Sequence, residues 1–179
     1  MYEVMDIINR RESCRGYQNI PVEKEVLLNC IEAARLAPSA CNSQPWSYYV
    51  VNNPQTASAM AKFLQEDGFN RFADQCSTFI IVLEEPAQLI NGATGEKMIS
   101  QRFASIDIGL SVMQLCLQAT AQGLSTCIMG SFNEEKIKHL LQKDWTQKIR
   151  LVIAIGYAKS DTIRKKIRKP LNEIVTFDE

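Results

Sequence analysis

APSACNSQPWSYYVV, residues 37–51, contains the transition on which the fold depends. An apolar helical pattern stops at Pro38, a polar loop follows, and residues 47–52 form an aromatic and β-branched run that is typical of a buried strand. The stretch therefore joins a predicted helix to a predicted strand through a polar loop. Asn42 and Gln44 lie two residues apart, so in an extended backbone their amides would point the same way. Polar loops between apolar elements often line binding sites, and this loop is the first candidate.

The composition is that of an ordinary globular protein. The 179 residues are 46% hydrophobic and 22% charged, which suits a single domain over residues 1–179 with a substantial core. The formal net charge is zero, so we expect no overall attraction to nucleic acid or to a membrane. No apolar run is long enough to span a bilayer, and the opening residues do not resemble a signal peptide. Six cysteines without a CxxC pair and a single histidine make a zinc site unexpected, so we expect a cytoplasmic protein with reduced thiols.

Helical and strand patterns alternate outward from residues 37–51. Apolar residues at helical spacing predict helices at 2–9, 21–37, 54–65, 102–122 and 134–141, with Pro21 opening the second and Asn133 capping the last. Apolar runs predict further strands at 78–83, 126–129 and 148–155, and residues 84–100 predict a loop or a partly helical excursion. About four to five strands covered by helices predict an α+β sandwich or an α/β fold, with a mixed or antiparallel sheet.

The helix at 102–122 is apolar nearly all round, which predicts a central buried helix or a subunit interface. Asp107 begins its apolar part and is expected to be structural. The tail, residues 158–179, is too polar to form a core of its own, so it is either disordered or laid over another surface.

Basic residues gather near both ends of the chain. Arg11, Ser13 and Arg15 are spaced two apart, so one extended segment could aim all three at a single anion, near which Arg10 also lies. A second cluster lies in the tail, RKKIRK at residues 164–169. Each cluster is either a solvated face or, with the other, half of one anion site.

Four stretches together resemble successive signatures of the nitroreductase family of flavin enzymes. They are RESCRGY at 11–17, the stretch at 37–51, IDIGLSVMQLCLQATAQGLSTCIMGSF at 106–132 and IGYAKSDTIRKKIRKPLNEIV at 155–175. They occur in the order of that family and span nearly the whole chain. The resemblance implies an α+β sandwich that forms an intertwined homodimer, with FMN held in two clefts at the subunit interface.

The resemblance also implies the roles of individual residues. Two sets would meet the phosphate and ribityl end of FMN, and two would lie by its ring system. The first two sets are Arg11, Ser13 and Arg15 at the start and Lys166 and Arg168 in the KxRxP motif of the tail. The other two are the loop that approaches from the partner subunit, Pro38, Ser39, Ala40, Asn42 and Gln44, and the strand end Met129 and Gly130.

The implied activity is FMN-dependent oxidoreduction by ping-pong hydride transfer. NADH or NADPH would be the reductant, and a small electron-poor molecule such as a nitroaromatic or quinone would be the acceptor. No side chain need act as acid or base, and Arg15 could favour the anionic reduced flavin. The alternatives are a specialised flavin enzyme of the same family with another substrate, a flavin-binding protein without turnover, and a domain without flavin.

The sequence departs from the family pattern at two positions. Glu12 stands where many members have a second arginine, and Arg10 could compensate. Met129 stands where some members carry an acidic residue beside the flavin, which bears on substrate details. The segment 84–100 is short for a helical lid, so an open, permissive substrate site is expected.

Four further residues, named in the next sentences, have side chains that could contribute to a site. Asn70 is either an amide near the flavin pyrimidine or an ordinary loop residue. Cys41 is not expected to be a nucleophile because no histidine lies nearby in the sequence to activate it. Trp46 is expected to pack under the loop, and His139 to lie at the surface.

Overall fold

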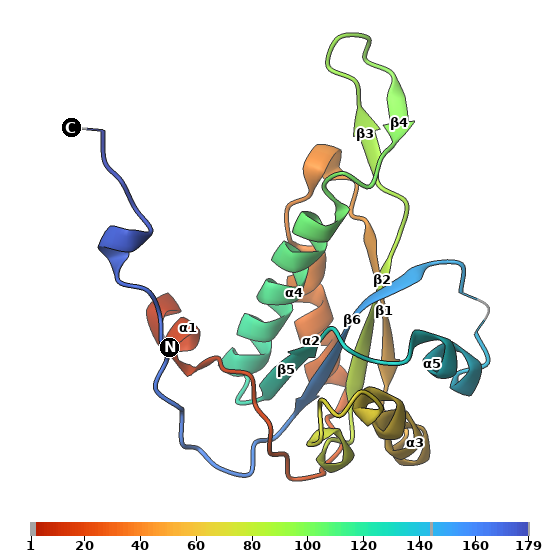
Figure 1. Ribbon diagram of the computed structural model, residues 1–179, viewed down its shortest axis with the longest axis vertical. Helices are drawn as coiled ribbons and strands as arrows, with labels where there is room; N and C mark the ends of the chain where they lie inside the picture. Colours follow the sequence, from red (N-terminus) through yellow and green to blue (C-terminus); the bar gives the residue numbers. More distant parts are fainter. Residues whose placement is uncertain (1–2, 144, 179) are drawn as a thin grey trace.

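Four antiparallel strands form the centre of the molecule in the computed structural model, which describes residues 3–143 and 145–178. Tyr48 pairs with Val82 and Ile80 with Ile153, and every neighbouring pair of strands is antiparallel. The sheet therefore confirms the α+β prediction and not the α/β alternative, whose strands would run parallel. The spatial order is β1 (Trp46–Val51), β2 (Phe79–Glu84), β6 (Lys148–Gly156) and β5 (Ser125–Met129) (Figure 1).

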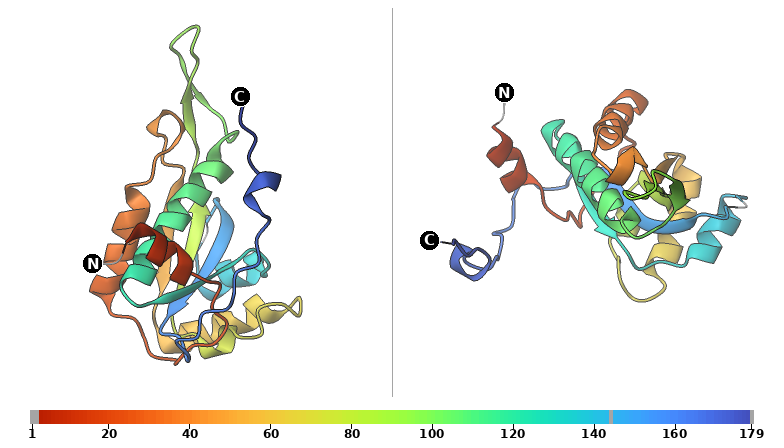
Figure 2. Two further views of the ribbon diagram at one scale, coloured as in Figure 1. Left: turned by 90° about the vertical axis from the view of Figure 1, so that its left-hand side faces the viewer. Right: turned by 90° about the horizontal axis from the view of Figure 1, so that it is seen from above.

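Helices cover both faces of this sheet. Side chains of β2 alternate between the layers, with Ile80 and Val82 on one side and Phe79, Ile81 and Leu83 on the other. All five are buried, as expected for an unbroken apolar run in a strand covered on both faces. The layers are α2 (Lys24–Arg35) and α4 (Ala104–Ala121) on the Ile80 side, and α3 (Pro54–Gln65) and α5 (Glu134–Leu140) on the Phe79 side (Figure 2).

Asparagine caps fix the first residues of α3 and α5. The Asn53 side chain accepts the Thr56 N–H at 3.0 Å, and Asn133 accepts the Lys136 N–H at 3.1 Å. Each cap satisfies a backbone donor that has no partner within its helix. The predicted cap at Asn133 is confirmed, and α3 has the predicted bounds.

The second helix begins three residues later than predicted, so Pro21 is not its first turn. The Val22 N–H lies 3.4 Å from Thr78 Oγ1, and the Val22 carbonyl accepts the Asn52 amide at 2.9 Å. Residues 21–23 are therefore held in extended form against the end of the sheet, and Glu23 takes the N-cap position of α2. Long-range bonds override the helical start that proline favours.

Residues 84–100 form a β-hairpin, so the predicted loop or helical excursion is wrong. β3 (Gln88–Ile90) and β4 (Lys97–Ile99) pair antiparallel and project beyond the end of the sheet (Figure 1). Asn91 accepts the Ala93 N–H at 2.9 Å in the turn, and Gly95 has a φ of +73° that favours glycine. Strands of three residues that bury only Leu89 give almost no periodic signal, which explains the error.

The first helix and the tail stand off from the body on the α4 side (Figure 2). The first helix, α1 (Val4–Arg10), has no buried residue. The helix predicted at 2–9 included Tyr2, and the tail prediction included Glu179; both residues lie outside the described part of the chain. The tail is extended apart from one turn at Leu171–Glu173, and its apolar residues Ile167 and Phe177 are exposed.

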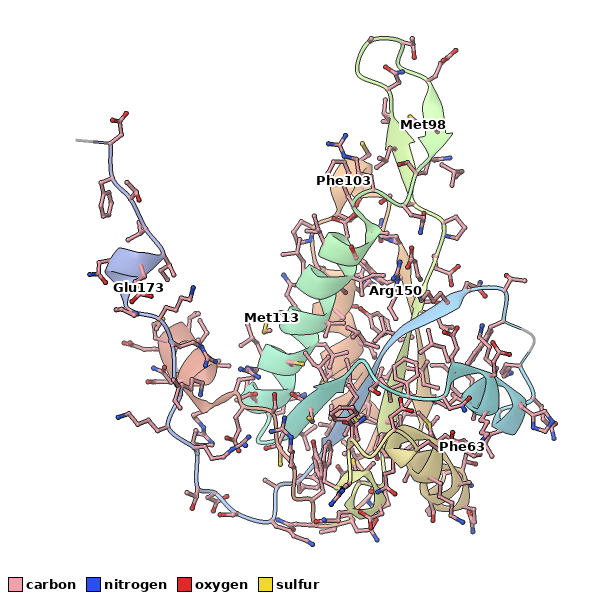
Figure 3. The ribbon with its side chains drawn as sticks, viewed as in Figure 1. Phe63, Met98, Phe103, Met113, Arg150 and Glu173 are labelled. Atoms are coloured by element: carbon pink, nitrogen blue, oxygen red, sulfur yellow. The ribbon has the colours of Figure 1, made fainter. Side chains whose placement is uncertain are left out.

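One face of α4 stays exposed although the helix is apolar nearly all round. Ile106, Leu110 and Met113 are 60%, 45% and 40% exposed and recur at the spacing of one helix face. These three residues are called the α4 stripe below, and Figure 3 shows Met113 on the side of α4 that faces α1 and the tail. In the single chain α4 is therefore buried along one face, while the α4 stripe remains exposed. In the part of the chain that the structure describes, no helix is long and apolar enough to cross a membrane.

Candidate functional site

The segment after α1 is fixed to the edge of the sheet by its backbone. Ser13 bridges Thr126 of β5 in parallel, and the Cys14 N–H donates to the Thr126 carbonyl at 2.9 Å. Tyr17 is buried and its hydroxyl lies 3.3 Å from the Ala154 carbonyl of β6. The positions of the neighbouring arginines are therefore set by the ends of two core strands.

The tail returns to this segment and completes a cavity of about 320 Å³. Arg164 Nε donates to the Glu12 carboxylate at 2.9 Å, and Lys166 Nζ donates to the Asn9 carbonyl at the end of α1. The two basic clusters near the ends of the chain therefore line one cavity, which the alternative of a shared anion site predicts. The five predicted site residues that meet there are Arg11, Ser13, Arg15, Lys166 and Arg168. The cavity, called the cation cradle below, is lined by Arg11, Glu12, Ser13, Arg15, Arg164, Lys165, Lys166, Ile167 and Arg168.

The cation cradle is strongly positive although the whole chain is neutral. Six of its nine lining residues are Arg or Lys, and Glu12 is the one acid among them. Its field extends to the strand beneath. Burial raises the pKa of the Cys127 thiol, and the positive charges of Arg15 and Arg164 oppose that shift. Guanidinium and ammonium donors around one space can bind an anion with several oxygens, such as a phosphate group.

Glu12 has a structural task in the cradle. Its carboxylate is paired with Arg164, so it joins the N-terminal segment to the tail and neutralises one of the six cations. The exposed side chain of Arg164 limits the free energy of this pair. Glu12 therefore links the two basic segments that form the cradle.

The loop at 38–44 is not extended, so the prediction that an extended backbone aligns the Asn42 and Gln44 amides is wrong. Cys41, Asn42 and Gln44 have φ values of 51°, 53° and 47°, in the left-handed region. The amides meet all the same, because Gln44 Nε2 donates to Asn42 Oδ1 at 3.2 Å. Ser39 Oγ accepts the Gln44 N–H at 2.9 Å and closes the loop. Most of these side-chain contacts shape the loop itself.

The loop and the cradle lie at opposite ends of α4. The Ala40 N–H donates to Asp107 Oδ2 in the first turn of α4, whereas Thr120 in its last turn lines a cavity together with Glu12. Asp107 and Thr120 are roughly 20 Å apart along the helix, at about 1.5 Å per residue. One chain therefore does not bring these two groups of predicted site residues together.

The strand end at Met129 and Gly130 divides its roles between side chain and backbone. The Met129 side chain is buried in the α3/α5 layer of the core, so it does not face the surface. Gly130 is exposed, and a Cβ there would meet nothing within 4 Å. The Asn70 amide donates to the carbonyls of Leu64 and Ser131 at 3.0 and 2.9 Å, which holds the backbone next to Gly130.

Of the remaining candidates, the surface position predicted for His139 is confirmed. Cys41 and His139 lie at the surface, and Trp46 is buried between the sheet and the α2/α4 layer. Within residues 3–143 and 145–178, no three His, Cys, Asp or Glu side chains gather as a metal site.

Known proteins match both the sequence and the fold. The model of the nitroreductase family matches residues 8–157, most of the chain. The chain belongs to the nitroreductase family. Within the family, YodC of Bacillus subtilis is 28% identical over 203 residues, covering 99% of this chain and 100% of that protein. The oxygen-insensitive NADPH nitroreductase of Helicobacter acinonychis is 26% identical, covering 96% of this chain and 94% of that enzyme.

A solved structure agrees with the nitroreductase fold. The FMN complex of a protein from Exiguobacterium sibiricum has a TM-score of 0.77 to this chain at 23% identity. It covers 99% of this chain and 98% of that one. The match extends over the sheet, both helical layers and the tail, and it shows a shared fold.

The nitroreductase motifs did not indicate two residues that the structure places at the site. Arg164 lines the cradle, and the signal for it was the basic run of the tail itself. Asp107 binds the loop at Ala40, and no local pattern could have shown this contact across 67 positions of sequence.

Proposed function

We propose that this chain is an FMN-dependent oxidoreductase that uses NADH or NADPH to reduce electron-poor acceptors such as nitroaromatics and quinones. The observation that carries the proposal is the cation cradle, where six cationic side chains and Ser13 from both ends of the chain face one cavity. The phosphate of FMN is an anion that such a donor set suits. Family membership, the NADPH nitroreductase among the relatives and the FMN in the Exiguobacterium sibiricum structure support this choice of cofactor and reductant.

The residues of the cradle would hold the cofactor by its phosphate end. Arg11, Arg15, Lys166 and Arg168 supply the charge, and the Ser13 hydroxyl supplies a donor for the ribityl chain or phosphate. Gly130 offers open backbone to a flat ring, and the Met129 side chain supports it from the core. The chemistry that FMN supplies when bound is hydride transfer from NAD(P)H to the acceptor in ping-pong order. The protein would bind the cofactor, orient it and adjust its reduction potential, and the proposed reaction needs no side chain as acid or base.

The same proposal includes a homodimer with the cofactor at the subunit interface. Pro38, Ser39, Ala40, Asn42 and Gln44 would face the cofactor held by the other subunit's cradle. Two observations support this arrangement: the roughly 20 Å along α4 between loop and cradle, and the exposed α4 stripe beside an extended tail. We also propose a cytoplasmic location for this single-domain enzyme, in which its six free cysteines stay reduced.

Mixed dimers test whether two chains share each site. One variant carries a broken cradle, Arg11→Glu with Arg15→Glu, and the other a blocked loop, Ala40→Trp. If sites are shared, co-expression of differently tagged variants gives mixed dimers with one intact site, although each variant alone is inactive. If each site belongs to one chain, the mixed dimers stay as inactive as the two homodimers, and the shared-site proposal is wrong.

The activity is tested on the purified wild-type protein. We expect a yellow protein, or one that becomes yellow with FMN, that oxidises NADH or NADPH only when a quinone or nitroaromatic is supplied. A protein that binds FMN but turns over neither acceptor would be a flavin-binding protein or a specialised enzyme, and a substrate panel separates these two. A colourless protein that does not take up FMN would overturn the proposal.

A further inference from the structure

The loop at 38–44 is a strained segment that needs outside support. Cys41, Asn42 and Gln44 all have positive φ, and none of them is glycine. Side chains with a Cβ adopt this region at a cost in free energy, and such residues persist when their surroundings hold them there. The bonds from Gln44 to Ser39 and to Asn42 keep the shape of the loop, but they do not fix its place relative to the core.

A buried carboxyl group provides a bond between the loop and the core. Asp107 is 4% exposed, and its Oδ2 accepts the Ala40 N–H at 3.1 Å. No ion pair of the described residues involves Asp107, so its carboxyl group does not serve a buried salt bridge there. A carboxyl in the first turn of a helix also favours the helix dipole, but that effect needs neither burial nor a contact with Ala40.

The next turn of α4 fixes the elements on either side of the loop. Ser111 lies four residues after Asp107, on the same face of the helix, and is fully buried. Its hydroxyl donates to the Ala34 carbonyl near the end of α2 at 2.7 Å and contacts the Tyr48 hydroxyl on β1. One helix face thus fixes the end of the helix before the loop, the loop itself and the beginning of the strand after it.

We propose that Asp107 is a positioning residue that sets where the loop at 38–44 stands at the other subunit's flavin. The inference rests on the proposed function for what the loop faces, and on the Asp107–Ala40 bond for how the loop is held. Asp107 acts through Ala40 and does not touch the cofactor or substrate. Asp107 was expected to be structural, and this proposal gives it a specific role, which is to align Ser39, Asn42 and Gln44.

Amide hydrogen exchange tests the bond without any need for flavin. Asp107→Ala should raise the exchange of the Ala40 amide by about tenfold or more, because its acceptor is lost. Asp107→Asn keeps an oxygen acceptor and should restore most of the protection. Thr120→Val is the matched control, since the buried Thr120 hydroxyl bonds to Cys116 within the same helix and does not reach the loop. Unchanged exchange in Asp107→Ala would overturn the inference.

Mixed dimers with one working site then test the consequence at the flavin. The working site takes its cradle from the Ala40→Trp chain and its loop from the Arg11→Glu/Arg15→Glu chain. Asp107→Ala in the chain that supplies the loop should lower kcat/KM for the acceptor by about tenfold and alter the visible spectrum of bound FMN. In the other placement the working site keeps a wild-type loop, so these readouts should match the parent mixed dimer.

The two placements separate positioning from a general loss of stability. An equal loss of kcat/KM in both placements would show a merely structural role and overturn the inference. If the wild type does not bind FMN, the proposed function fails and the flavin-facing role fails with it. The exchange experiment still decides in that case whether Asp107 fixes the loop.

Discussion

Replacement of Leu110 by glutamate is expected to break the proposed dimer. Leu110 lies at the centre of the α4 stripe and is 45% exposed in the single chain, between Ile106 and Met113 at 60% and 40%. Full burial of such a side chain is worth about 1.5–3 kcal/mol, so burying the remaining half of each gives about 1 kcal/mol. Three side chains on each of two copies would then contribute about 6 kcal/mol to association.

Leu110→Glu removes two of these contributions and adds two carboxylates to a surface that excludes water. The lost apolar burial amounts to about 2 kcal/mol for the dimer, and desolvation of the two unpaired charges costs at least about 3 kcal/mol more. A total of about 5 kcal/mol raises the dimer Kd by more than about a thousandfold. FMN should be lost with the dimer, because each site would lack its second wall.

Sedimentation velocity from nanomolar to micromolar protein measures this shift, with flavin absorbance followed in the same runs. Leu28→Glu is the matched control, because Leu28 is a leucine on α2 with 54% exposure outside the α4 stripe. The Leu28 variant should remain dimeric and yellow. A Leu110→Glu protein that is still an FMN-loaded dimer at nanomolar concentration would refute the interface, and so would equal dissociation of both variants.

Three further predictions concern the cradle, the core and the thiols. Arg15→Ala should raise the Kd for FMN about tenfold or more and lower the reduction potential of the flavin, because a charged donor is lost. Titration with FMN and potentiometry measure the two changes, and the control is Arg35→Ala, since Arg35 is an exposed arginine paired with Glu32. Unchanged values in Arg15→Ala would show that Arg15 does not bind the cofactor. Phe79→Ala should lower the free energy of unfolding by about 3–5 kcal/mol, since Phe79 is fully buried in the sheet. Chemical denaturation measures this loss, and a variant whose unfolding free energy lies within about 1 kcal/mol of the wild type, as for a surface substitution, would contradict the packing. Burial raises the pKa of the Cys30 thiol to about 11 and that of the Cys76 thiol to about 12. The neutral thiols therefore stabilise the fold fully below a pH of about 9, and this stabilisation is lost as the pH rises towards the two folded-state pKa values. Denaturation at stepped pH measures the decline, and an unfolding free energy that stays constant at alkaline pH would contradict it.

Local signals accounted for most of the secondary structure. The predicted start of α3 follows from Pro54 and the cap of α5 from Asn133, and both residues act within one turn of their own position. The first residue of α2 could not be predicted in the same way. It depends on the contacts of Val22 with Asn52 and Thr78, which the fold brings together from other parts of the chain.

In the candidate site too, features that depend on neighbouring residues could be predicted, and features that depend on distant contacts could not. The charges of Arg11, Arg15 and Lys166 indicated an anion site, because two basic clusters are visible without knowledge of the fold. The shape of the loop was not visible, since left-handed backbone at Cys41 and Gln44 runs against the preference of residues that carry a Cβ. Burial of a side chain at a strand end, as at Met129, likewise depends on which face the strand turns to the core.

The place of β6 in the sheet has a consequence for how the chain is made. β6 is the last strand in the sequence, yet it lies between β2 and β5 and is the one described strand that β5 pairs with in this sheet. A chain leaving the ribosome therefore carries β2 with an open apolar edge, and β5 without a neighbour, until residues 148–156 have emerged. Exposed strand edges of this kind invite aggregation. A product that stops short of β6 is expected to be a client of chaperones and proteases, because the sheet closes only after residues 148–156 have emerged.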